Sequence, residues 1–199
     1  TLHNTLFPYT TLFRSRLDGR HRPLDSSSHE GPIFLTCTNG RRDACCAKWG
    51  RAMAEAMTGA AGRQAWQTTH LGGHRFAPTL LVLPHGSQYG WVEPDDAEPL
   101  VEAHRNGRLY RLDRYRGHVG FTRPAQAAAA FLRAEVDAHE LDALTLRGIT
   151  PKGSASKDGT PQGQMSRVRF RVGMTTYDVE IRHEKGQPMP LSCGADPKP

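Results

Sequence analysis

Residues 69–90 read THLGGHRFAPTLLVLPHGSQYG and contain the strongest apolar run of the chain. That run, residues 76–84, is rich in Leu and Val, which is typical of a buried strand. Residues 84–86 (PHG) interrupt it, and residues 88–93 (QYGWVE) then predict a second strand. The two strands are close enough in sequence to form a hairpin.

The elements around this hairpin follow from similar patterns. Residues 32–37 (PIFLTC) and 63–70 (RQAWQTTH) predict two short strands. Between them, residues 44–57 favour a helix because they are rich in Ala and Met and contain no Pro, and Gly59 should close it. Residues 95–107 predict a second helix, from a start signal at an aspartate to a glycine. The order β-α-β-β-β-α predicts a compact α/β sheet with a hairpin at its edge.

The rest of the chain predicts a small α+β extension. Residues 125–136 should form a helix on their alanine content. Residues 168–172 and 177–181 alternate apolar and polar side chains around a glycine, which predicts a second hairpin. Residues 150–164 predict a flexible loop, and the tail over residues 185–199 should be irregular.

The N-terminal residues are not expected to belong to the fold. Residues 5–15 (TLFPYTTLFRS) back-translate to a string that resembles a common short-read sequencing adapter, so we interpret residues 1–15 as an assembly artefact. Residues 16–31 are polar and predict a linker or the remnant of a truncated N-terminal region. The predicted division is therefore a sheet domain over residues 32–122 and the extension over residues 123–199.

The composition of the 199 residues is that of a soluble globular protein, with 37% hydrophobic residues and a formal charge of +6. No apolar run approaches the length that a membrane span requires, so no membrane association is expected. The basic charge suits an acidic partner, whereas nucleic acid is disfavoured because Asp and Glu are mixed throughout. Of the four cysteines, Cys45 and Cys46 are adjacent, which is awkward for a secreted disulfide framework; a reducing cytoplasm is expected.

Four potential ligands for a soft or borderline metal fall at the ends of predicted elements: Cys37, Cys46, His70 and His74. In a β-α-β unit the carboxyl ends of the strands and the start of the helix meet at one edge, so these side chains can converge. The two glycines between the histidines allow the sharp turn that convergence needs. Because adjacent side chains point in different directions, at most one of Cys45 and Cys46 should bind the same ion. The alternative without a metal is that the two histidines are solvated in a loop and the cysteines are buried as small hydrophobic side chains.

Residues 37–46 (CTNGRRDACC), followed by residues 69–90, closely resemble the sucrase/ferredoxin-like family, whose core is a thioredoxin-like ferredoxin. The resemblance is strongest over residues 32–120 and implies an α/β thioredoxin-like ferredoxin sheet with flanking helices. It also implies a 2Fe–2S cluster, for which the ligands would be Cys37, Cys46, His70 and His74. Ordinary thioredoxin-like ferredoxins have a Cys-x3-Cys pair where this chain has His-x3-His. Nothing in these residues suggests glycoside chemistry. Pro78 resembles the proline that borders the active edge of thioredoxin folds.

The resemblance implies one-electron transfer, with the two cysteines on one iron and the two histidines on the other, as in Rieske-type ligation. Neutral imidazoles in place of thiolates leave the oxidised cluster neutral, which raises its potential and lets its ligands titrate. Substrate chemistry would then belong to a partner protein with an acidic docking face. Basic residues beside the ligands could contact that partner, although ordinary ion pairing, including with Asp43, is an equal alternative: Arg41, Arg42, Lys48 and Arg75.

Two other functions are compatible with the same residues. One is a structural Cys2His2 zinc module, and the other is a thioredoxin-like thiol redox enzyme that uses Cys45 or Cys46. The eight residues between Cys37 and Cys46 disfavour both, because zinc sites and thioredoxins use shorter cysteine spacings.

Cys193 should be structural or incidental. A final arginine run with two tyrosines predicts a solvated basic face rather than a nucleic-acid surface: Arg105, Arg108, Arg111, Arg114 and Arg116 with Tyr110 and Tyr115.

Overall fold

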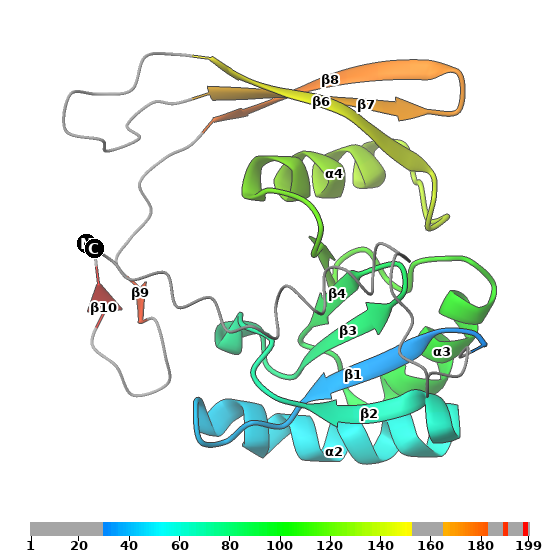
Figure 1. Ribbon diagram of the computed structural model, residues 1–199, viewed down its shortest axis with the longest axis vertical. Helices are drawn as coiled ribbons and strands as arrows, with labels where there is room; N and C mark the ends of the chain where they lie inside the picture. Colours follow the sequence, from blue (N-terminus) through cyan, green and yellow to red (C-terminus); the bar gives the residue numbers. More distant parts are fainter. Residues whose placement is uncertain (1–29, 153–164, 183–188, 191–196, 199) are drawn as a thin grey trace, which may run out of the picture. The chain divides into compact units, whose positions relative to one another are not determined.

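The structure is a computed structural model that describes residues 30–152, 165–182, 189–190 and 197–198 (Figure 1). The predicted artefact over residues 1–15 and Cys193 lie outside the described residues, as do nearly all of the predicted linker and most of the predicted loop over residues 150–164. These expectations therefore stay predictions.

A five-stranded sheet forms the centre of the N-terminal part, in the order β2-β1-β3-β4-β5. Its strands are β1 (Ile33–Cys37), β2 (Ala65–Thr68), β3 (Thr79–Leu83), β4 (Ser87–Gly90) and β5 (Tyr115–His118). β1 and β2 are parallel, and the remaining pairs are antiparallel. A parallel β-α-β unit with a hairpin on the other side of its first strand is the thioredoxin-like arrangement. The predicted element order is confirmed, whereas β5 was not predicted because arginines obscure its apolar pattern.

Helix α2 (Ala44–Ala61) connects the parallel strands and packs along one face of the sheet (Figure 1). Helix α3 (Ala97–Arg105) packs beside it, after a single 3-10 turn, η3 (Pro94–Asp96). The prediction that Gly59 ends the first helix is wrong. The helix continues through two further alanines to Gly62, whose φ of 55° suits glycine, and the Gly62 N–H donates to the Thr58 carbonyl.

The core between this sheet and the two helices is built from large side chains of both layers. Phe34 of β1, Leu80 of β3 and Tyr89 of β4 meet Met53, Met57 and Leu100 of the helices, and all six are fully buried. Burial of this apolar surface fixes α2 against β1. The first turn of α2 is thereby held at the carboxyl end of β1, where the candidate ligands lie.

The C-terminal part has its own sheet and core. Helix α4 (Arg123–Glu135) packs on a three-stranded antiparallel sheet of β6 (Leu144–Lys152), β7 (Met165–Val172) and β8 (Thr175–Arg182). The helix and the β7–β8 hairpin were predicted, but β6 was not. The tail is not wholly irregular as expected, because β9 (Met189–Pro190) pairs with β10 (Pro197–Lys198).

Several arginines of the arginine-rich stretch pair with acidic groups at the surface. Arg108 contacts Glu140 at 2.8 Å, and Arg111 contacts Asp113 at 2.8 Å. Tyr115 is buried in the core, and the hydroxyl of Tyr110 donates to Asp96. Tyr115 therefore offers no open ring to a stacked base.

Candidate metal centre

Strand ends and one helix start bring the candidate ligands together. Cys37 is the last residue of β1, and the pairing of Cys37 with Thr68 sets the end of β2 beside it. His70 follows that end by two residues, while Cys46 lies in the first turn of α2. The cysteine side chains are fully buried, with exposures of 0% for Cys37 and 1% for Cys46.

Three of the four predicted ligands form one group. The sulfurs of Cys37 and Cys46 and a ring nitrogen of His70 all lie within 4.8 Å of one another. His74 does not belong to this group, although it lies near the centre. Thiolates and imidazole are the donors of zinc and iron–sulfur sites, so the chemistry of this donor set fits a soft or borderline metal.

The loop that carries His74 turns as its glycines predict. Gly72 and Gly73 adopt φ of 84° and 65°, a region that other residues rarely occupy. His74 then opens the 3-10 turn η2 (His74–Phe76). The Cys45 thiol donates to the carbonyl of His74 at 3.4 Å, so Cys45 contacts the loop and is turned away from Cys46.

Asp43 is a residue of the site that the sequence did not single out. Ion pairing with neighbouring cations was one of two alternatives for it, and the structure places its carboxylate, which is 1% exposed, beside the two histidines. One oxygen lies 3.5 Å from Nδ1 of His70, and the other lies 3.8 Å from Nδ1 of His74. The loop before it is shaped by Asn39, whose side-chain oxygen accepts from the backbone N–H groups of Arg41 and Arg42.

The buried Cys46 thiol holds its proton tightly. Burial raises the pKa of the Cys46 thiol well above its ordinary value, and the nearby Cys37 side chain, which shares a hydrogen bond with it, raises it further. A bound cation reverses this balance, because metal ligation stabilises thiolates and releases their protons. The site is therefore suited to a cation and poorly suited to a free thiolate.

Gly50 is a second residue that the sequence did not single out. It lies in α2 one turn beyond Cys46, and a Cβ atom there would overlap the carbonyl oxygen of Cys37. Glycine thus allows α2 to approach β1 closely at the level of the two sulfurs. A glycine four residues after a cysteine on a predicted helix was the available signal.

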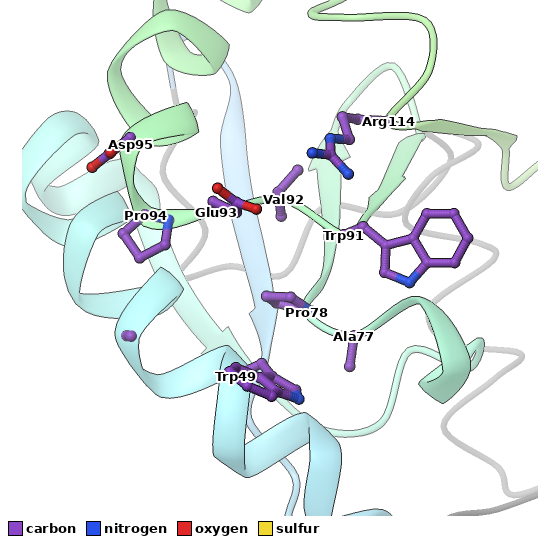
Figure 2. A pocket seen from close by; sticks show the side chains of 10 residues that line it. Trp49, Ala77, Pro78, Trp91, Val92, Glu93, Pro94, Asp95 and Arg114 are labelled. Carbon is purple, nitrogen blue, oxygen red and sulfur yellow. The ribbon is translucent and has the colours of Figure 1, made fainter.

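A cavity of about 500 Å³ is lined by residues of α2 and of the segments that flank β3 and β4 (Figure 2). Pro78, which follows a cis peptide bond, lies on its floor, and Trp49 of α2 lies three residues beyond Cys46. Trp91 lines the opposite side, where its indole N–H donates to the carbonyl of Arg75 at 3.0 Å. Both tryptophans are about half exposed, so the cavity has an aromatic opening.

The fold and the site together define a thioredoxin-like protein with a Cys/His centre at the strand ends. The chain belongs to the sucrase/ferredoxin-like family, because a model of that family matches residues 4–117, more than half of its length. The matched range begins within residues 1–15. In the described part of the chain, no helix is both long and apolar enough to cross a membrane.

Relatives match parts of the chain. Over 97 residues, 44% of the chain, it is 29% identical to Altered inheritance of mitochondria protein 32 from Meyerozyma guilliermondii. The match spans 34% of that relative's length. A structure of a thioredoxin-like 2Fe-2S ferredoxin from Aquifex aeolicus aligns with 46% of the chain and 94% of its own, at 19% identity and a TM-score of 0.39. A wild-type structure of the thioredoxin-like 2Fe-2S ferredoxin from Aquifex aeolicus aligns with 44% of this chain and 97% of its own chain, at 20% identity and a TM-score of 0.38.

Proposed function

We propose that this protein carries single electrons through a 2Fe–2S cluster bound by Cys37, Cys46, His70 and His74. The observation that carries the proposal is the group of two buried sulfurs and one partly exposed imidazole at the carboxyl ends of the parallel strands. Membership of the sucrase/ferredoxin-like family agrees with this chemistry. When bound, such a cluster accepts and returns one electron.

The ligands divide naturally into two pairs. Cys37 and Cys46 lie side by side in the core and would hold one iron as thiolates. His70 and His74 share the carboxylate of Asp43 and would hold the other iron as neutral imidazoles. The position of Cys45, whose thiol donates to the His74 carbonyl, agrees with a role outside the ligand set.

The residues around the ligands suit electron exchange with another protein. The cysteine side is buried, whereas the side chains of His70 and His74 are 28% and 11% exposed, so the histidine side is nearer to solvent. We propose that a redox partner with an acidic face docks here, because exposed cations surround this edge: Arg41, Arg42, Lys48 and Arg75. The aromatic opening between Trp49 and Trp91 offers an apolar contact beside them.

A structural zinc site is the second candidate. Three ligand atoms within 4.8 Å of one another are also compatible with one tetrahedral ion. The thiol redox alternative is disfavoured at Cys46, because burial raises the pKa of that thiol and disfavours the thiolate that would act as nucleophile.

Reconstitution separates these candidates. Protein prepared anaerobically with iron and sulfide should become red-brown and contain two irons and two sulfides per chain. A colourless protein that retains one zinc and no sulfide would support the structural zinc site instead.

A further inference from the structure

Asp43 lies between the two histidines in a manner that ordinary helix capping does not explain. It occupies the N-cap of α2, where an aspartate usually accepts a hydrogen bond from the first helical N–H groups. Its side chain makes no such bond. One carboxylate oxygen instead lies 3.5 Å from Nδ1 of His70 and the other 3.8 Å from Nδ1 of His74.

The histidine nitrogens that face Asp43 depend on it. Nδ1 of His70 and Nδ1 of His74 are both buried and have no hydrogen-bond partner within the described residues. A buried N–H without an acceptor is costly, and the carboxylate oxygens lie 3.5 Å and 3.8 Å away. These separations are longer than a direct hydrogen bond, but the negative charge still favours a proton on the nitrogen that faces it.

We propose that Asp43 is a positioning residue that keeps the proton of both His70 and His74 on Nδ1. The Nε2 lone pair of each ring is thereby left for the metal. Carboxylates hold ligand histidines in this way at many metal sites, fixing both the tautomer and the ring orientation. The proposal rests on the proposed function in that it takes both histidines as ligands.

Asparagine is the informative substitution because it keeps the shape of Asp43 but not its two acceptors. The amide offers one acceptor oxygen and one NH2 group, so it can serve the Nδ1–H of only one imidazole. The other imidazole would have to accept from the NH2 group at Nδ1 and move its own proton to Nε2. Asp43→Asn should therefore leave one histidine with its proton on Nδ1 and shift the proton of the other to Nε2, whereas both carry it on Nδ1 in the parent protein.

The experiment reads the histidine tautomers in the metal-free full chain by long-range 1H–15N spectra, at a pH where both imidazoles are neutral. Signals are assigned with His70→Gln and His74→Gln. Asp96→Asn is the matched control, because Asp96 is also a buried carboxylate at a helix start and accepts from the Tyr110 hydroxyl. Asp43→Ser provides a second variant that retains a capping side chain if Asp43→Asn does not fold.

The expected result is Nδ1–H for both histidines in the parent protein and in Asp96→Asn. At least one ring should change to Nε2–H in Asp43→Asn or Asp43→Ser, with Zn²⁺ affinity lower by roughly 10–100-fold. An Nε2–H tautomer at either histidine of the parent, or unchanged spectra in the folded Asp43 variants, would overturn the proposal. Because no cluster is needed, failure to form a 2Fe–2S cluster would refute the proposed function and leave this readout intact.

Discussion

The backbone of Gly50 lies directly against the carbonyl oxygen of Cys37, at a position where no Cβ atom fits. This contact joins the second turn of α2 to the end of β1, and Cys46 lies one turn earlier on the same helix. The separation of the two sulfurs is therefore set by a helix–strand contact that only glycine allows.

Gly50→Ala should lower the free energy of unfolding by about 1–3 kcal/mol, because α2 or β1 must move to admit the methyl group. Gly59 lies on the same helix with no atom within 4 Å of its missing Cβ. Gly59→Ala should therefore raise the free energy of unfolding by roughly 0.5–1 kcal/mol. Denaturant titration of both variants measures the two changes. Equal effects would show that the close approach at Gly50 does not matter.

The stability of the protein should fall in mild acid because of His104. This imidazole is buried beside the Tyr89 hydroxyl at 2.9 Å, and burial, with a smaller contribution from His85, lowers the pKa of His104 to about 4. A folded pKa below the unfolded value of about 6.5 means that the contribution is complete above pH 6.5 and is lost as the pH falls toward 4. The loss amounts to roughly 3 kcal/mol.

Unfolding free energies between pH 7 and pH 4 test this prediction. The unfolding free energy of His104→Gln should depend less on pH than that of the parent. Part of the dependence should remain in the variant, because burial also lowers the pKa of His85 and of His118. His139→Gln is the control, since His139 lies beside Asp137 on the surface. A dependence in His104→Gln as steep as in the parent would assign the effect to other groups.

The reduction potential should fall with pH if imidazoles bind the cluster. Each ligand imidazole has a second nitrogen whose proton is held more tightly when the iron is reduced. Between the oxidised and reduced pKa values, one proton follows each electron and the slope is roughly 59 mV per pH unit. His70→Cys should lower the potential, because it adds a negative ligand, and should flatten the slope. Spectroelectrochemical titration measures both, and a pH-independent potential in the parent contradicts histidine ligation.

The two adjacent cysteines should behave differently on substitution. Cys46→Ser removes a proposed ligand from the buried group and should abolish cluster formation. Cys45→Ser should keep the cluster, because serine can still donate to the His74 carbonyl that Cys45 contacts. Iron and sulfide content after reconstitution distinguishes the variants. Loss of the cluster only in Cys45→Ser would mean that the ligand assignment is wrong.

The order of elements could be predicted because strong local signals mark it. The apolar run that becomes β3 and the glycines at 72 and 73 specify their structure within a few residues. The same local reasoning ended α2 too early at Gly59, since two alanines carry the helix past a glycine that costs it about 1 kcal/mol. It missed β5 because arginines alternate with the tyrosine and glycine that face the core.

The position of the candidate site was partly predictable, but its surroundings were not. Strand-end placement indicated that four side chains would converge, and Cys37, Cys46 and His70 do meet, whereas His74 lies outside that group. Asp43 and Gly50 depend instead on contacts between elements distant in sequence. No local pattern shows that a helix-start aspartate turns toward a loop about thirty residues away, or that a helix passes within a methyl group of a strand carbonyl.

The most direct test of the account is the electron–nuclear hyperfine spectrum of the reduced, reconstituted protein labelled with 15N at histidine only. Ligation by both histidines predicts a paramagnetic 2Fe–2S signal coupled to two histidine nitrogens, one of which is lost in His70→Cys and the other in His74→Cys. A cluster signal without any histidine nitrogen coupling, or with coupling unaffected by either substitution, would contradict ligation by Cys37, Cys46, His70 and His74.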